Sequence, residues 1–223
     1  MLSMTPIAQN ITMIREKIAR AAQACGRAPD SVHLVAVSKT QAPERIQGAL
    51  DAGLRLFGEN RVQEAKERWA GLKEKYPDLV LHFIGPLQTN KVKDAVKLFD
   101  VIETLDRPKL ARALSVEMKK QNRFLSCFIQ VNTGAEEQKA GVSPEALPEF
   151  LTLCREDCGL GIRGLMCIPP VDEPPAAHFA LLKTLARKQN LSELSMGMSA
   201  DFEEAIAQGA THVRIGTALF GGR

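Results

Sequence analysis

The sequence of 223 residues predicts an α/β fold, a single (β/α)8 TIM barrel with an extra N-terminal helix. Short runs rich in valine, isoleucine and leucine alternate with segments whose apolar residues recur at helical spacing, and the alternation continues along the chain. About eight such units can be counted, and barrels of this kind usually have about 250 residues with a lower limit near 200. An open doubly wound sheet is the alternative, because the last two expected strands are short.

The expected elements begin with the extra helix, which covers residues 7–25 and ends before Gly26. The first strand, residues 34–39, reads Leu-Val-Ala-Val-Ser-Lys, an apolar, β-branched run typical of a strand buried on both faces. The other strands are expected at residues 54–57, 79–84, 101–105, 125–131, 162–168, 191–195 and 212–215. The helices between them are expected at residues 43–53, 89–99, 108–120 and 200–208. Three more are expected: one whose apolar face runs from Val62 to Leu72, one that begins at Ser143 and continues to Cys154, and one that carries Phe179, Leu182 and Leu185.

Composition argues against several classes of protein. The formal net charge of +3 is too small to indicate a nucleic acid as the partner, and no uninterrupted apolar run approaches the length that spans a membrane. The cysteines include no Cys-x-x-Cys pair, which argues against a disulfide framework and a zinc knuckle. We therefore expect no metal and a reduced, cytoplasmic setting. The cysteines are Cys25, Cys127, Cys154, Cys158 and Cys167.

Lys39 ends the first expected strand, and a barrel of this class places its active groups at the carboxyl ends of its strands. Burying an ammonium group is costly unless the group is paired or neutralised. A neutralised lysine is an amine that can attack a carbonyl. The alternative is that Lys39 extends into solvent or pairs with a carboxylate.

The ends of the seventh and eighth expected strands are candidates for a phosphate site, because barrels commonly bind phosphate there. Ser199 is expected to cap the following helix, whose free N–H groups attract an anion. Gly216 lets the backbone approach a ligand closely, and Thr217 offers a hydroxyl. Each residue could instead serve only as a cap or turn residue. Asp201, an acid in the first turn of the same helix, would compete with an anion for its positive end.

A lysine that can form an imine and a phosphate site on the same rim indicate a phosphorylated aldehyde or ketone. Two classes fit: a Schiff-base aldolase acting on a sugar phosphate, and a protein that holds pyridoxal 5′-phosphate (PLP). Arg214 bears on this choice, because an arginine facing the pyridine nitrogen would leave it unprotonated and make PLP a weaker electron sink. A salt bridge at the barrel rim explains Arg214 equally well.

Six segments resemble the YggS/PROSC family of PLP homeostasis proteins, and they span nearly the whole chain in order. They are residues 34–39, 57–60 (Phe-Gly-Glu-Asn), 82–91 (His-Phe-Ile-Gly-Pro-Leu-Gln-Thr-Asn-Lys), 163–166 (Arg-Gly-Leu-Met), 197–199 and 213–217. The family is similar to the N-terminal barrel of alanine racemase. The resemblance implies that PLP forms a Schiff base with the lysine that ends the first strand, here Lys39.

The resemblance also implies the other cofactor-binding positions. Those that bind the phosphate correspond to Ser199, Gly216 and Thr217. Arg214 corresponds to the arginine that faces the pyridine nitrogen, while Asn60 and Met166 correspond to positions that line the pocket.

The chain departs from many members of this family at Arg61, where they have tyrosine, which leaves a ring or hydroxyl contact there in doubt. The loop of residues 132–141, with Lys139 and Gly141, also follows a strand, but we assign it no chemistry.

A racemase needs two acid/base groups, and its second base comes from a domain that this chain is too short to include. The only tyrosine, Tyr76, lies between a helix and a turn, and His82 and His212 lie within expected strands as core residues. We therefore expect no catalytic residue. The expected function is PLP binding in intracellular vitamin B6 homeostasis.

Two alternatives stay open from the sequence. One is a PLP-dependent racemase or transaminase-like enzyme of low activity, and the other is an interaction module with an empty barrel. As partners we expect PLP itself and PLP-dependent apo-enzymes, and we expect the chain to be a monomer.

Overall fold

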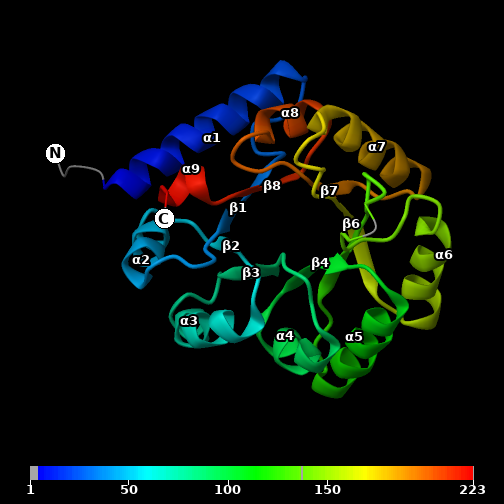
Figure 1. The fold of residues 1–223 in the computed structure, drawn as a ribbon. Helices are drawn as coiled ribbons and strands as arrows, with labels where there is room; N and C mark the ends of the chain where they lie inside the picture. The colour runs from blue at the N-terminus through cyan, green and yellow to red at the C-terminus, as the bar shows by residue number, and fades with distance from the viewer. Residues whose placement is uncertain (1–4, 137, 223) are drawn as a thin grey trace.

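A computed structural model describes residues 5–136 and 138–222 and shows a closed barrel (Figure 1). Its eight parallel strands pair in chain order, and β8 closes the barrel by pairing with β1. The strands are β1 (His33–Val37), β2 (Leu56–Glu59), β3 (Val80–Phe83), β4 (Val101–Leu105), β5 (Ser126–Gln130), β6 (Gly161–Met166), β7 (Glu193–Ser195) and β8 (His212–Ile215). The predicted TIM barrel is thus confirmed over the open doubly wound sheet, which would leave two edge strands unpaired.

Helices surround the barrel and cover the outer faces of the strands (Figure 1). They are α2 (Pro43–Asp51), α3 (Val62–Lys75), the 3-10 turn η1 (Thr89–Lys91), α4 (Val92–Leu98), α5 (Pro108–Gln121), α6 (Leu147–Thr152), the π-helical turn η2 (Leu153–Asp157), α7 (Pro175–Lys188), α8 (Phe202–Ala207) and α9 (Thr217–Phe220). The predicted extra helix is α1 (Pro6–Ala24), which Thr5 caps by accepting the N–H of Ala8 at 3.3 Å. It packs against α2, α8 and α9, where the N- and C-terminal parts of the chain meet.

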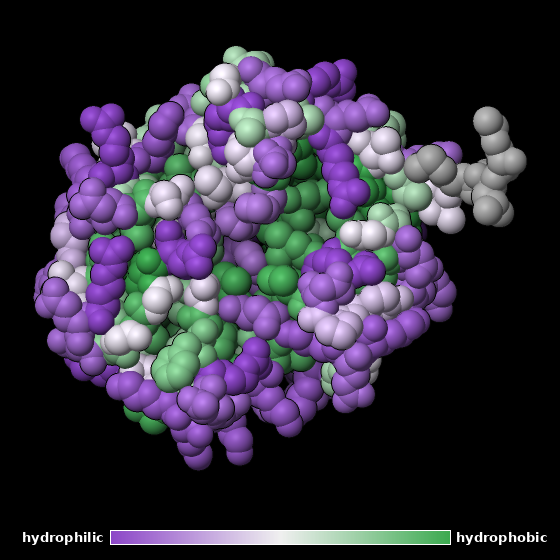
Figure 2. Space-filling view, turned by 180° about the vertical axis from the view of Figure 1, so that it is seen from behind, coloured by the Kyte–Doolittle hydropathy of each residue, from purple (hydrophilic) through white to green (hydrophobic). Residues whose placement is uncertain are grey.

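Two layers of side chains are buried, and they differ in character. The layer between strands and helices is apolar and includes Leu34, Ala36 and Trp69. Strand residues alternate between the helix layer and the lumen, so a second set of side chains faces the lumen. This second set includes polar as well as apolar side chains. The surface is mostly hydrophilic at its periphery, with hydrophobic side chains showing nearer the middle of the face in Figure 2. Within the described residues, no helix is long and apolar enough to cross a membrane, and no cluster of side chains has the composition of a metal site.

The structure departs from the predicted elements at several boundaries. β1 ends at Val37, so Lys39, which was predicted to end this strand, lies two residues beyond it. α7 is longer than predicted and runs from Pro175 to Lys188. β2 begins and ends two residues later than predicted, so it includes Glu59. α6 begins at Leu147, because the hydroxyl of Ser143 accepts the N–H of Ala146 (3.3 Å) in a turn before the helix. α9 was not predicted at all, since four residues are too few to show helical periodicity.

Candidate functional site

Lys39 lies in a turn two residues beyond the carboxyl end of β1, and it is half-buried. Within the part of the chain that the structure describes, its ammonium group has neither a hydrogen-bond nor an ion-pair partner. The next residue, Thr40, has a φ of 59°, a left-handed conformation that is uncommon for a β-branched side chain. The alternative in which Lys39 pairs with a carboxylate is therefore not found among the described residues.

Strand register gives Lys39 its neighbours on both sides. In β2, Gly58 pairs with Val37 of β1 and accepts the N–H of Ser38 at 3.1 Å, so continuing the register brings Asn60 beside Lys39. On the other side, Ala36 pairs with Ile215, which brings Gly216 beside Val37. Lys39 is thus flanked by Asn60 and by the start of α9.

Two observations mark this rim as a place for a ligand. The Oδ1 atom of Asn60 is buried and has no hydrogen-bond partner in the described structure, although buried polar atoms are usually paired. A Cβ added to Gly216 would lie 3.3 Å from both Cβ and O of Val37, so a side chain here would crowd the end of β1. The polar atom and the tight backbone both border the turn that holds Lys39.

The predicted phosphate residues come together at the ends of β7 and β8. Ser199 is half-buried, and its hydroxyl accepts the N–H of Ala218 at 3.3 Å. Our prediction that Ser199 caps the helix after β7 is wrong, because it contacts the first turn of α9 and Asp201 is the N-cap residue of α8. Asp201 accepts the N–H of Met198 at 2.6 Å, so its carboxylate is engaged in its own loop. The Ser199 and Thr217 hydroxyls lie at the start of α9, beside Gly216.

Arg214 is only 4% exposed and is fixed by two hydrogen bonds. Its Nη1 donates to Oγ of Ser195 at 2.7 Å, and its Nη2 donates to the carbonyl oxygen of Cys167 at 2.8 Å. Met166 is fully buried at the end of β6 and pairs in register with Ser195. Arg214 therefore spans the ends of β6, β7 and β8, which places Met166 beside the same group.

A buried carboxylate inside the barrel supports Arg214. Oε2 of Glu103 accepts the hydroxyl of Ser195 at 2.6 Å and lies 3.9 Å from Nη1 of Arg214, while its Oε1 lies 2.5 Å from Nδ1 of His82. Burial alone would raise the pKa of Glu103, but hydrogen bonds and charge from His82, together with Arg214 and Ser195, outweigh it and lower the pKa to about 2. Glu103 therefore stays ionised at neutral pH.

Histidine rings fill the lumen below this network. The ring of His212 lies 4.9 Å from His33, 5.7 Å from His82 and 5.4 Å from Phe128, measured between ring centroids. Because β3, β5 and β8 are not neighbours, these rings can meet only inside the barrel. They border a cavity of about 420 Å³ near the amino ends of the strands, the end opposite to Lys39. The core role predicted for His82 and His212 agrees with this placement.

Acid sensitivity is expected from His212, because burial lowers the pKa of its imidazole to about 3. An unfolded histidine has a pKa of about 6.5, so between these two pH values the unfolded chain binds a proton that the native chain does not bind. The free energy of unfolding should fall with decreasing pH through this window, by up to about 1.4 kcal/mol per pH unit.

Denaturant unfolding of the wild type and of His212→Phe between pH 7 and pH 4 measures this effect. The variant should show a shallower loss of stability with decreasing pH than the wild type, because it lacks the buried imidazole. An unchanged slope in His212→Phe would assign the acid sensitivity to other groups.

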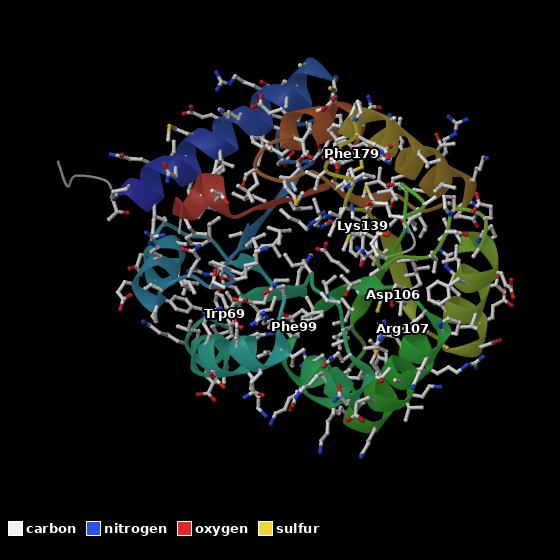
Figure 3. The ribbon with its side chains drawn as sticks, viewed as in Figure 1. Trp69, Phe99, Asp106, Arg107, Lys139 and Phe179 are labelled. Carbon is white, nitrogen blue, oxygen red and sulfur yellow. The ribbon has the colours of Figure 1, made fainter. Side chains whose placement is uncertain are left out.

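The remaining candidates lie apart from Lys39 or are already paired. The side chain of Arg61 is 72% exposed and forms an ion pair with Glu64 at 2.9 Å. Lys139 pairs with Glu136 at 2.5 Å and projects from the β5–α6 loop (Figure 3). The hydroxyl of Tyr76 accepts a hydrogen bond from Nε2 of Gln47 at 2.9 Å outside the barrel.

Sequence reasoning missed Ser195, Glu59 and Glu103. Glu103 carried a usable signal, because an acid in the middle of the apolar run 101–105 must find partners when the strand is buried. Glu59 carried the same signal at the end of β2. Ser195 carried none, since a serine at a strand end is an ordinary turn residue.

Comparisons with known proteins show the family to which the chain belongs. The family model "Alanine racemase, N-terminal domain" matches residues 9–223. A pyridoxal phosphate homeostasis protein from Pseudomonas aeruginosa is 45% identical over 227 residues, which cover 99% of this chain and 97% of the relative.

Two solved structures extend the comparison. PipY of Synechococcus elongatus, in a structure with PLP bound, superposes with a TM-score of 0.83 at 37% identity and covers 96% of this chain and 100% of its own. An alanine racemase from Clostridium difficile is similar in fold, with a TM-score of 0.72 at 14% identity, and the match covers 96% of this chain but 57% of the racemase. The chain therefore belongs to the alanine racemase N-terminal domain family, and within that family to the pyridoxal phosphate homeostasis proteins.

Proposed function

We propose that this protein binds PLP as a Schiff base on Lys39 and serves PLP homeostasis without catalytic turnover. One observation carries the proposal: Lys39 is half-buried at the carboxyl end of β1, has no partner among the described residues, and lies between Asn60 and the start of α9. A lysine held in this way is free to react with an aldehyde. Its Nζ would add to the aldehyde carbon of PLP, and water would leave.

The residues around Lys39 suit the chemical groups of PLP. The hydroxyls of Ser199 and Thr217, which lie at the start of α9, are donors for a phosphate. The buried Oδ1 of Asn60 needs a donor. Arg214, fixed by Ser195 and Cys167, offers a cation where a ring nitrogen must accept. Bound PLP supplies an electrophilic aldehyde and a weak electron sink in these surroundings.

The carrier role is favoured over an enzyme for two reasons. A second acid/base group facing Lys39 is lacking among the residues that the structure describes, since Tyr76 lies outside the barrel and His82 and His212 lie in its lumen. In addition, the relative that is 45% identical is named a pyridoxal phosphate homeostasis protein, a name that describes no reaction. We propose that residues 1–223 act as one PLP-binding barrel.

Absorption spectroscopy with borohydride trapping tests the proposal. Adding PLP to the purified protein should produce a visible band distinct from that of free PLP, and borohydride should fix the cofactor to the peptide that contains Lys39. A protein that traps a sugar phosphate and no PLP would belong to the aldolase class. Steady turnover of a free amino acid, dependent on Lys39, would replace the carrier role with a racemase or transaminase.

The phosphate assignment predicts a loss of affinity in the double variant Ser199→Ala/Thr217→Val. Hydrogen bonds to a charged group are worth about 1.5–3 kcal/mol each, so the dissociation constant of PLP should rise at least about tenfold. Stability should change by less than about 1 kcal/mol, because Ser199 is half-buried and Thr217 is exposed. Equilibrium dialysis and denaturant unfolding measure the two quantities, with Ser143→Ala as the matched control. Unchanged PLP affinity would overturn the assignment.

The partners and setting follow from this role as further proposals. We expect delivery of PLP to PLP-dependent apo-enzymes, a monomeric state and a cytoplasmic location. The five cysteines are free thiols, which supports a reducing compartment.

A further inference from the structure

Glu59 is a fully buried carboxylate directly behind the turn that holds Lys39. It ends β2 and faces the helix layer, not the lumen. Its Oε1 accepts three hydrogen bonds, from Oγ of Ser38 at 2.7 Å, from Nη1 of Arg68 at 2.7 Å and from Nε1 of Trp69 at 2.9 Å. Arg68 and Trp69 both come from α3, and Figure 3 shows Trp69 at that helix. A buried carboxylate with this many donors is held in one position.

The same carboxylate and its arginine hold both ends of the turn 38–41. Ser38 begins the turn, and its hydroxyl is bound to Glu59. Gln41 ends it: its N–H donates to the carbonyl of Ser38 at 3.2 Å, and its own carbonyl accepts from Nη2 of Arg68 at 3.4 Å. Lys39 and Thr40 lie between these two anchored residues. We call Ser38, Gln41, Glu59 and Arg68 the turn clamp.

The turn needs such support. Thr40 adopts a φ of 59°, and a non-glycine residue persists in this strained region only where its surroundings enforce the conformation. Lys39 itself has no partner that could fix it within the described residues. Its direction therefore depends on the backbone of the turn, and the turn depends on the clamp.

The two charged residues of the turn clamp, Glu59 and Arg68, neutralise each other. The clamp can therefore position Lys39 without adding a net charge beside its amine. Glu59 is fully buried, and Arg68, with a side chain 17% exposed, lies 2.7 Å from it. A close ion pair on the far side of the backbone exerts little net field on Lys39. Arg68 and Gln41 also line a cavity of about 830 Å³ between α2 and α3. A substitution of Arg68 therefore changes the helix layer and leaves the lumen of the barrel unchanged.

We propose that Glu59 and Arg68 are positioning residues, which act through Ser38 and Gln41 to aim the Lys39 amine at an aldehyde bound on the barrel rim. The inference rests on the proposed function. Under this inference, the phosphate and ring of PLP bind without help from the turn clamp. The condensation of Lys39 with the aldehyde depends on the turn clamp.

The experiment compares two rates and one affinity in Ser38→Ala, Arg68→Lys and Trp69→Phe. Ser38→Ala cuts the clamp at the first end of the turn without leaving a buried charge unpaired. Arg68→Lys keeps a cation beside Glu59 but loses the planar fork that reaches Gln41 as well. Trp69→Phe is the matched control, because it removes a hydrogen bond to the same oxygen without any link to the turn.

The rate of Schiff-base formation is followed by stopped-flow absorption after PLP is added, and the rate of its hydrolysis is followed after dilution. Affinity for 4′-deoxypyridoxine 5′-phosphate, which lacks the aldehyde, reports on the binding site alone. Formation should slow by about tenfold to a hundredfold in Ser38→Ala and Arg68→Lys, as expected for a reacting group misplaced by about 1 Å. Binding of the analogue should stay within about twofold, because a displaced amine does not alter the phosphate and ring contacts.

Trp69→Phe should match the wild type in both rates and in analogue affinity. Wild-type formation rates in both Ser38→Ala and Arg68→Lys would overturn the inference, as would an equal slowing in Trp69→Phe, which would reduce the cluster to general support of β2 and α3. If the wild type binds the analogue but traps no PLP on Lys39, the proposed function fails, and the inference fails with it.

Discussion

Replacing Lys39 by alanine is expected to abolish the visible absorption of the PLP-loaded protein and to leave no borohydride-fixed cofactor. The covalent bond is lost, while the phosphate and ring contacts remain, so PLP should bind weakly and reversibly. The fold should be unaffected: Lys39 has no partner within the described residues, and such substitutions usually change stability by less than about 0.5 kcal/mol. Spectra, trapping and unfolding curves of the variant measure all three effects.

Lys91→Ala is the control for this experiment, because Lys91 is also half-buried but lies in η1, after β3, where it lines a cavity together with Asn60 and Arg61. It should keep the wild-type spectrum and the wild-type adduct. If Lys39→Ala still yields a trapped adduct, the peptide that carries it will show which other amine holds the cofactor, and Lys39 will lose its assigned role.

Removing the Glu103 carboxylate is expected to cause the largest loss of stability. Glu103→Ala leaves His82 and Ser195 without their buried acceptor and Arg214 without its buried counter-charge, and breaking a buried ion pair from one side typically costs about 3–5 kcal/mol. Glu103→Gln keeps the size and some of the hydrogen bonds and should cost less. Denaturant unfolding at pH 7 measures both variants.

The exposed pair of Arg163 and Glu193 provides the comparison. The two side chains approach to 2.7 Å, but the arginine side chain is 60% exposed, and solvent-exposed pairs are worth about 0–1 kcal/mol. Glu193→Gln should therefore have a small effect. If Glu103→Ala lowers the free energy of unfolding by no more than Glu193→Gln does, the hydrogen bonds and ion pairs of Glu103 do not stabilise the barrel.

The charge of Glu103 also limits stability in acid. Its pKa is lowered to about 2 in the folded protein, below its ordinary value near 4.5, so its contribution is fully present above about pH 4.5. The contribution is lost as the pH falls toward 2. This window lies below most of that of His212, so acid should weaken the barrel in two overlapping stages.

Much of the fold followed from local pattern. The predicted bounds of β4 and β8 match the structure, because their apolar runs are bounded by clear turn residues. The position of Lys39 at a strand end was also readable from the abrupt end of an apolar run. These features depend on residues close together in the chain.

The parts that could not be predicted depend on the closure of the barrel. Ser199 was assigned to the wrong helix, because its contact with Ala218 requires β7 and β8 to lie side by side. Glu103, Ser195 and Arg214 lie far apart in the sequence, and only the shared lumen brings them within hydrogen-bond distance. The same holds for the link between Ser38 and Glu59, which joins two strands.

Cys167, whose carbonyl oxygen holds Arg214, has a consequence for chemical selectivity. A thiolate near the barrel rim would compete with Lys39 for an aldehyde by forming a thiohemiacetal. The thiol of Cys167 is fully buried in the apolar layer outside the barrel, and burial raises its pKa to about 12. The chain thus uses the backbone of this cysteine while keeping its sulfur protonated and out of reach, which leaves the amine of Lys39 without a sulfur competitor from this residue.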